Sequence, residues 1–243
     1  MVIAGVVIDK KDENKLKIFG VKDSKELSPK RRSELSEFIE KTAKSVIVLR
    51  IPACKIHTYI KSKINLNRVE AMKIAEIIEM TNFDDIYIDA PQKVDSEGIK
   101  PNKFKILIKD FIQDDGKKNV NMIVKNYLDE SVPVVSAASV IAKVERDAQI
   151  DELRKKLNFD FGNGYPGNPK TIEFLEKILR ENTEPPPYVR WHWSSVFETA
   201  ERLLDQGVML QPWVRKEILK TDSWQIKIKD FFKKKEKCIE EQK

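Results

Sequence analysis

Acidic side chains are the residues of this sequence best suited to chemistry. Asp89 ends a short strand expected over residues 85–89, and Asp147 lies on a long helix expected over residues 134–157. In α/β proteins, sites are built where strands end. A hard cation such as Mg²⁺ binds one or two carboxylates together with waters and substrate phosphate, and it would offset their mutual repulsion. The pair therefore indicates metal-dependent phosphoryl chemistry.

Each of these carboxylates also has an ordinary structural explanation. Asp89 precedes Ala90-Pro91 and could form a turn, and Asp147 could pair with Lys143 one helical turn earlier. Other kinds of catalysis have less support. The chain has two histidines, His57 and His192, and it contains no G-x-S-x-G, Walker or G-x-G-x-x-G motif.

Composition limits the possible partners of the protein and its cellular compartment. The 243 residues include 45 Lys and Arg against 39 Asp and Glu, which gives a net charge of +6. This balance permits a nucleic-acid partner without requiring one. The two cysteines, Cys54 and Cys238, have no metal-type spacing, so a reducing cytoplasm is expected. No apolar run approaches the roughly 18 residues of a membrane-spanning helix, so no membrane contact is expected.

The elements that would position the carboxylates alternate between strand and helix, which predicts an α/β fold with one main sheet. Strands are expected over residues 1–8, 17–20, 45–51, 85–89 and 119–125. Helices are expected over residues 29–43, 57–63, 68–80, 101–113, 134–157, 171–180 and 193–204. On the long helix, an apolar stripe of Ala137, Val140, Ile141, Val144 and Ala148 should face the core.

Four motifs together resemble ribonuclease HII in its archaeal form. They are GVKDSKELS at 20–28, YIDAP at 87–91, SAASVIAKVERD at 136–147 and GNGYP at 162–166. They occur in the order of that family and span residues 1 to 204. The resemblance implies a ribonuclease H-like mixed sheet flanked by helices, with a helical C-terminal extension. It also implies an endonuclease that cuts the RNA strand of an RNA–DNA hybrid, or cuts at a single ribonucleotide in duplex DNA.

The resemblance also implies roles for individual residues. Asp89 and Asp147 match two of the four carboxylates with which the family binds two ions, here Mg²⁺ or Mn²⁺, for catalysis. Tyr165 matches the tyrosine that packs on the sugar at the ribonucleotide junction. The residues expected to face backbone phosphates are Ser24, Lys25 and Lys143, although ordinary solvated or paired roles stay open for them.

The sequence departs from the family at its first motif. Asp-Glu-Ala-Gly-Arg-Gly, which ends the family's first strand, is absent. Its absence removes two catalytic carboxylates and would leave an uncovered strand edge beside residues 1–8. One hypothesis is that the intact protein starts further upstream, and the other is a shortened relative that binds hybrids without cutting them.

The C-terminal part carries a separate motif. Residues 1–204 are expected to form the catalytic domain, and residues 205–243 a basic tail. Gln225, Ile228, Phe231 and Phe232 resemble the peptide that docks on the sliding clamp of replication, with the apolar side chains filling a groove. The alternative is an amphipathic helix packed on the body. The resemblance implies a monomer that binds RNA–DNA hybrids and the sliding clamp. A further alternative is an adaptor protein for the sliding clamp, a function for which the tail alone would be sufficient.

Overall fold

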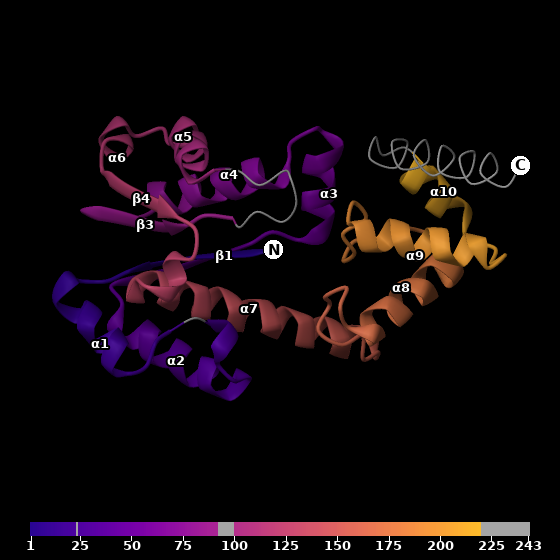
Figure 1. The fold of residues 1–243 in the computed structure, drawn as a ribbon, viewed down its shortest axis with the longest axis horizontal. Coiled ribbons are helices and arrows are strands. Elements are labelled where there is room, and N and C mark those ends of the chain that lie inside the picture. Colours follow the sequence, from indigo (N-terminus) through magenta and orange to yellow (C-terminus); the bar gives the residue numbers. More distant parts are fainter. Residues whose placement is uncertain (23, 92–99, 220–243) are drawn as a thin grey trace, which may run out of the picture. The chain divides into compact units, whose positions relative to one another are not determined.

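The computed structural model describes residues 1–22, 24–91 and 100–219, in which strands and helices alternate (Figure 1). The strands are β1 (Val2–Val7), β2 (Ser45–Arg50), β3 (Asp85–Asp89) and β4 (Asn121–Lys125). The helices are α1 (Glu13–Ile18), α2 (Pro29–Thr42), α3 (Ala53–Lys61), α4 (Leu66–Glu79), α5 (Pro101–Phe111), α6 (Asp115–Lys118), α7 (Pro133–Leu157), α8 (Pro169–Glu181), α9 (Ser194–Asp205) and α10 (Pro212–Leu219). Single 3-10 turns include η2 (Ser24–Glu26) and η4 (Leu128–Glu130).

The chain divides into two compact units. The N-terminal unit contains Met1–Ile51 and Tyr59–Glu152, and the C-terminal unit contains Pro52–Thr58 and the chain from Leu153 onward. The predicted α/β class is confirmed, because strands and helices alternate through the N-terminal unit. The helical C-terminal extension is confirmed as well, since α8, α9 and α10 follow one another without a strand.

The strands form two small sheets, where one main sheet was expected. β1 and β2 pair antiparallel, with Val2 opposite Arg50 and Val7 opposite Ser45. β3 and β4 pair parallel, with Asp85 opposite Asn121 and Asp89 opposite Lys125. In the described part of the chain β1 has β2 as its one strand partner.

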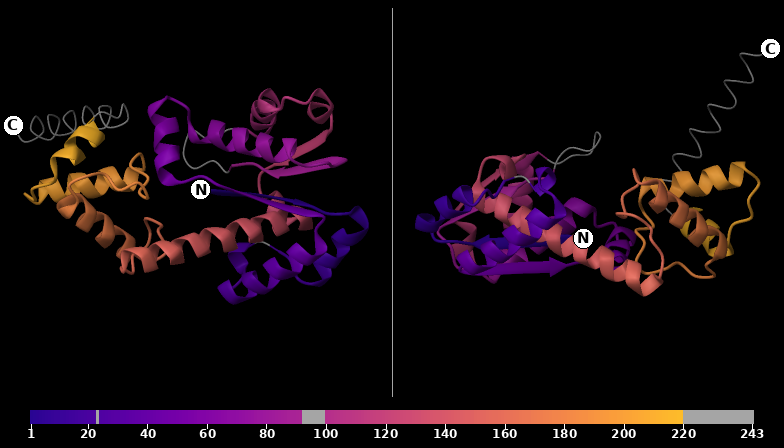
Figure 2. Two further views of the ribbon diagram at one scale, coloured as in Figure 1. Left: turned by 180° about the vertical axis from the view of Figure 1, so that it is seen from behind. Right: turned by 90° about the horizontal axis from the view of Figure 1, so that it is seen from below.

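Helix α4 covers one face of both sheets (Figure 2). A methyl group on Gly5 of β1 would lie 2.5 Å from Cγ2 of Ile77, so α4 and β1 are in direct contact. Ala71, Ala75 and Ile78 of α4 belong to the core that also contains Ile86 and Ile88 of β3 and Phe104 and Ile108 of α5. The two sheets therefore share one covering helix although they do not pair.

A second core joins α1, α2 and α7 to the β1–β2 sheet. It contains Leu35 and Ile39 of α2 together with Ala137, Val140 and Ile141 of α7. These three residues confirm most of the predicted stripe, and Val144 packs at its edge. Ala148 is exposed, because the stripe leaves the core after two turns.

One predicted strand is wrong. Residues 17–20 complete and follow helix α1, where the backbone N–H of Val21 bonds the carbonyl of Leu16. Leu16 is fully buried while Ile18 is 79% exposed, so the two side chains lie on different faces of this short helix. Gly20 has a φ of 88°, the left-handed conformation that commonly ends a helix.

The C-terminal unit has a core of its own. Leu179 of α8, Leu203 of α9 and Val214 of α10 are buried in it, and the indole rings of Trp191 and Trp213 meet edge to face with centroids 4.9 Å apart. Trp213 and Val214, which follow residue 204, lie inside this core.

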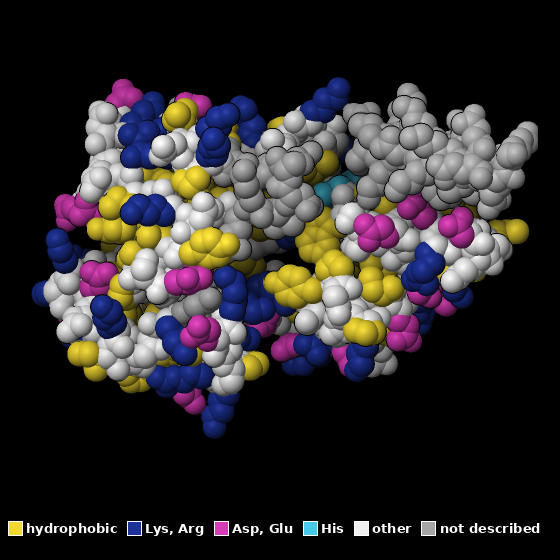
Figure 3. All heavy atoms as spheres, in the orientation of Figure 1, with side chains coloured by type: hydrophobic (Ala, Val, Ile, Leu, Met, Phe, Trp, Pro, Cys, Tyr) yellow, Lys and Arg dark blue, Asp and Glu magenta, His cyan; other side chains and the backbone are white. Residues whose placement is uncertain are grey.

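Charged side chains of both signs are distributed over the surface. On the face of the N-terminal unit drawn in Figure 3, Lys and Arg side chains alternate with Asp and Glu side chains and do not gather in one block. A binding surface for a polyanion on this face would therefore depend on individual cations at particular places, more than on the net charge of the unit.

Candidate active site

Asp89 stands at the carboxyl end of β3, as predicted. The Ile side chains on either side of Tyr87 point into the core, so Tyr87 and Asp89 share the opposite, more open face. The backbone N–H of Leu128 donates to Oδ1 of Asp89 over 3.0 Å. Burial raises the pKa of the Asp89 carboxyl above its ordinary value, and the neighbouring Asp129 carboxylate acts in the same direction. The amides of Leu128 and Tyr127 and the charge of Lys25 oppose this shift.

Asp129 is a candidate site residue that the sequence analysis did not name. It lies in η4, between β4 and α7, and its side chain is 5% exposed. Its Oδ1 has no hydrogen-bond partner among the described residues. A buried carboxylate oxygen without a partner is costly, and a bound cation would offset that cost. The sequence offered one partial signal, because Asp129 closely follows the strand predicted over residues 119–125 and sites are often built where strands end.

The turn between β4 and η4 brings the two carboxylates together. The side-chain amide of Asn126 donates to the carbonyls of Ala90 and Pro91 over 3.3 and 3.1 Å, which joins the ends of β3 and β4. Tyr127 follows with φ 60° and ψ 30°, the left-handed region that a large side chain rarely occupies. On the other side of η4, the hydroxyl of Ser136 on α7 donates to the carbonyl of Asp129 over 2.6 Å.

Lys25 places a positive charge beside both carboxylates, and its charge acts on the pKa of Asp89. Its Nζ lies 3.9 Å from Oδ2 of Asp129, and its side chain is 64% exposed. The neighbouring Ser24 is buried, and its hydroxyl lies 3.0 Å from that of Ser139 on α7. Turn η2 therefore brings one lysine to the carboxylates while its serine anchors it to the long helix.

Asp147 has surroundings that differ from those predicted. Its Oδ2 accepts from Arg32 and its Oδ1 accepts from Lys143 and Arg146, each over 3.0 Å. Burial acts to raise the pKa of the Asp147 carboxyl, but the hydrogen bonds from Lys143 and Arg146 outweigh it, and the pKa is lowered. The acidic neighbour that acts on Asp89 is Asp129. The structure thus gives Asp147 basic partners, and the pairing with Lys143 that the helix alone suggested is present.

The remaining predicted residues are dispersed. Lys143 donates to Asp147, and Tyr165 lies in the C-terminal unit, where its ring is 46% exposed. The backbone N–H of Tyr165 donates to Oδ1 of Asn163, which shapes the turn of the GNGYP motif. Substrate contacts of Tyr165, Ser24, Lys25 and Lys143 stay predictions. Gln225, Ile228, Phe231 and Phe232 lie outside the described residues.

The carboxylate pair fits a divalent ion. Asp129 offers an enclosed oxygen without a hydrogen bond, and Asp89 lies beside it. Carboxylate oxygens are the ligands that Mg²⁺ and Mn²⁺ prefer. In the described ranges no group of three or more Asp, Glu, His or Cys side chains lies together in a way that could hold a metal, so waters and substrate oxygens would complete the coordination.

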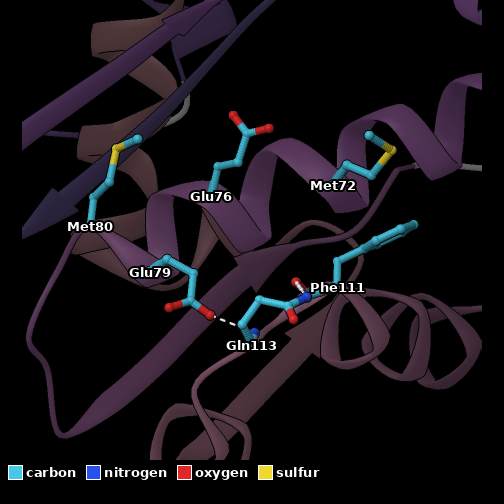
Figure 4. Close-up of a pocket in the computed structure, with 6 residues that line it drawn as sticks. All are labelled: Met72, Glu76, Glu79, Met80, Phe111 and Gln113. Carbon is cyan, nitrogen blue, oxygen red and sulfur yellow. Dashed lines mark hydrogen bonds between the residues drawn. The ribbon is translucent and has the colours of Figure 1, made fainter.

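A separate pocket lies between α4 and the end of α5 (Figure 4). Its volume is about 320 Å³, and Met72, Met80 and Phe111 supply its apolar walls. Glu79 points across it and accepts from the backbone N–H of Gln113 over 2.6 Å. None of the residues that line it is a candidate site residue, so it is not part of the carboxylate site.

Comparisons with known proteins agree with the motifs. A family model for ribonuclease HII matches residues 1–196. The ribonuclease HII of Methanosarcina barkeri is 37% identical over 208 residues, which cover 85% of this chain and 91% of that protein. The chain belongs to the ribonuclease HII family. The ribonuclease HII of Methanocaldococcus jannaschii is 38% identical over 218 residues, which cover 85% of this chain and 89% of that protein.

Solved structures of ribonuclease HII relatives confirm the predicted ribonuclease H-like fold. The ribonuclease H2 of Pyrococcus horikoshii OT3 is 30% identical with a TM-score of 0.68, over 84% of this chain and 99% of that one. The ribonuclease HII in the PCNA:RNase HII complex from Archaeoglobus fulgidus is 32% identical with a TM-score of 0.70, over 84% of this chain and 91% of that one. Membership of the ribonuclease HII family makes this chain a ribonuclease H type 2 endonuclease. In its described part, no helix is long and apolar enough to cross a membrane.

Proposed function

We propose that this ribonuclease HII cuts the RNA strand of RNA–DNA hybrids, and cuts at single ribonucleotides in duplex DNA, through ions held by Asp89 and Asp129. The observation that carries the proposal is the buried Oδ1 of Asp129, which has no hydrogen-bond partner among the described residues and lies beside Asp89. Asp129 takes the place that the sequence predicted for Asp147, because Asp147 is surrounded by Arg32, Lys143 and Arg146.

The protein's own groups have distinct tasks in this proposal. When bound, two Mg²⁺ or Mn²⁺ ions supply Lewis-acid stabilisation of the charge that develops on the phosphodiester. The amide of Leu128 holds the Asp89 carboxylate in place, and the hydroxyl of Ser136 holds the backbone of Asp129. Lys25, close to Asp129, would contact the substrate phosphate at the same place.

Recognition of the ribonucleotide would depend on Tyr165. An exposed tyrosine in a Gly-rich turn can pack on a sugar, and contacts around the 2′-hydroxyl distinguish RNA from DNA. Ser24 and Lys143 are the further predicted phosphate contacts. Ser24 would act through its backbone or after a rearrangement, since its hydroxyl is hydrogen-bonded to that of Ser139. A cytoplasmic location and a monomeric state remain predictions.

Three end-labelled duplexes of one sequence test the substrate class. One is all DNA, the second carries a single ribonucleotide, and the third has one strand entirely of RNA. With Mg²⁺ we expect cleavage of the second and third duplexes, and an intact first duplex. Tyr165→Ala should slow cleavage of the single-ribonucleotide duplex by about 10-fold or more, the order of a lost stacking contact. Cleavage of the all-DNA duplex would contradict the proposal, as would binding of the hybrid by a folded chain that never cuts it.

The C-terminal motif supports a second partner. The relative from Archaeoglobus fulgidus was solved as a complex with PCNA, and Gln225, Ile228, Phe231 and Phe232 have the spacing of a clamp-docking peptide. We propose that these residues dock on a sliding clamp as a short helix in an apolar groove. Phe231→Ala with Phe232→Ala should weaken clamp binding by at least about 10-fold in a titration, because such aromatic anchors dominate small interfaces. Lys233→Ala is the matched control, and equal affinity of both variants would contradict the docking role.

A further inference from the structure

Arg32 is a buried cation with three defined contacts. It lies in the first turn of α2 and is 8% exposed. One guanidinium nitrogen donates to the carbonyls of Ser24 and Leu27 over 3.2 and 2.6 Å. Another donates to Oδ2 of Asp147 over 3.0 Å. Arginine is rarely buried unless it is paired, and here its partners belong to two different elements, the segment around η2 and helix α7.

The segment held by Arg32 is the one that carries Lys25. Arg32 binds the carbonyls at residues 24 and 27, and the Ser24 hydroxyl contacts Ser139 on α7. The turn is therefore fixed at three points around Lys25. That lysine reaches 3.9 Å from Oδ2 of Asp129 although its own side chain is largely exposed. An exposed lysine has many rotamers, so the position of its backbone decides how often its ammonium group is at the carboxylates.

Asp147 fixes Arg32 from the other side. Its two oxygens accept from three cations, which leaves the carboxylate firmly oriented on α7. Arg32 could not be held equally well by a neutral partner, because a charge-assisted pair is stronger than a neutral hydrogen bond. A continuous chain of contacts thus leads from Asp147 through Arg32 to the backbone on either side of Lys25.

We propose that Arg32 and Asp147 are positioning residues that hold η2 against α7, so that Lys25 stands at the Asp89–Asp129 pair and meets the substrate phosphate there. The inference rests on the proposed function of that pair. It adds two residues, Arg32 and Asp147, that would act on the reaction without touching substrate or metal. It also gives Asp147 a role that differs from metal binding.

A double-mutant cycle on hybrid cleavage tests the proposal. Arg32→Met should lower kcat/KM by about 10-fold when Lys25 is present. In a Lys25→Ala background it should lower kcat/KM by no more than about 2-fold, because the lysine that Arg32 positions is then absent. A role confined to folding would give the same fold-change in both backgrounds, and that result would overturn the proposal. If Arg32→Met does not fold, Arg32→Lys replaces it in the same cycle. Lysine keeps the positive charge but lacks the planar set of N–H donors that binds several acceptors at once, so the same coupling to Lys25 is expected.

Variants on α7 provide the controls. Asp147→Ala should behave like Arg32→Met, while Asp147→Asn keeps an acceptor for Arg32 and should lose less. Glu145 lies on α7 two residues before Asp147 and pairs with Arg50 of β2, so Glu145→Gln breaks a different ion pair and should leave kcat/KM unchanged. Asp129→Asn separates the two proposals. If it cuts like the wild type, the carboxylate site itself is wrong, whereas its inactivity together with an additive Arg32–Lys25 cycle overturns the positioning role alone.

Discussion

Asp89 and Asp129 differ in the hydrogen bonds that the surrounding protein donates to their carboxylate oxygens. Asp89 accepts a backbone hydrogen bond from Leu128, whereas Asp129 has one enclosed oxygen with no donor in the described ranges. A fold that buries a carboxylate in this way loses free energy unless an ion or substrate group completes it. At the residue scale, this unsatisfied oxygen is what distinguishes a candidate ligand from Asp147, whose oxygens are occupied by basic side chains.

His192 should make the stability of the C-terminal unit depend on pH. Burial is the main cause that lowers its pKa from 6.5 to about 4, and the charges of Arg190 and His57 add to the shift. Between these two pH values the unfolded chain binds a proton that the folded chain does not. The free energy of unfolding therefore decreases as pH falls from about 6.5 to about 4, by up to about 3 kcal/mol from this residue.

Urea unfolding of wild type and His192→Phe across that range measures the effect. The free energy of unfolding of the wild type should fall toward low pH relative to that of His192→Phe, because the phenylalanine variant does not titrate at this position. His57→Gln, which keeps the His192 ring, is the matched control and should retain most of the slope. Parallel curves for wild type and His192→Phe would show that His192 has an ordinary pKa in the folded protein.

At the scale of elements, the turn between β4 and α7 holds the carboxylates together at the cost of backbone strain. Tyr127 has a φ of 60°, and its amide is among the groups that stabilise the Asp89 carboxylate. A β-branched residue resists this conformation more strongly than tyrosine does. Tyr127→Val should therefore lower the free energy of unfolding by about 1–3 kcal/mol, and Tyr127→Asn, which tolerates the left-handed region, should change it by much less. Equal losses in urea unfolding would indicate that the ring, rather than the backbone, is responsible.

Helix α4 is the element that joins the two sheets, and Gly5 tests its contact with β1. A methyl group on Gly5 would lie 2.5 Å from Cγ2 of Ile77. Gly5→Ala should cost about 1–3 kcal/mol through overpacking. In an Ile77→Ala background the same substitution should cost less, since the opposing methyl group is gone. Strict additivity of the two changes in a thermal or urea unfolding experiment would contradict this packing.

The elements were largely predictable from the sequence, because apolar periodicity and caps are local signals. Ser28 before Pro29 correctly marked the start of α2, and its hydroxyl accepts from the N–H of Arg31. The stripe on α7 was correct for the same reason. Residues 17–20 were assigned wrongly because six residues of α1 are too few to distinguish a period of 3.6 from an alternation.

The site was only half predictable, since it depends on contacts between distant segments. Asp89 could be found because it ends a strand. Asp129 lies in a 3-10 turn with no periodicity, 40 positions later in the chain, and only the parallel pairing of β3 and β4 brings it to Asp89. For Asp147, the contact with Arg32, 115 positions away, could not be deduced from the helix itself.

At the scale of the whole molecule, the two units have separate cores and carry different predicted tasks. The N-terminal unit contains the carboxylate pair and Lys25, and the C-terminal unit contains Tyr165. In the proposed function, the N-terminal unit would supply the chemistry and the C-terminal unit the contact with the sugar. The family assignment, which rests on residues 1–196, includes parts of both units.

Metal-dependent cleavage of a duplex with one ribonucleotide, by wild type, Asp129→Asn and Asp147→Asn, tests the central claim most directly. The wild type should cut with Mg²⁺ or Mn²⁺ and stop with chelator. Asp129→Asn should lose about 100-fold or more, while Asp147→Asn, which keeps a polar partner for Arg32, should stay within about 10-fold. Circular dichroism melts verify that all three are folded. Full activity of Asp129→Asn, or a folded wild type that binds the duplex and cuts it with neither ion, would contradict the account.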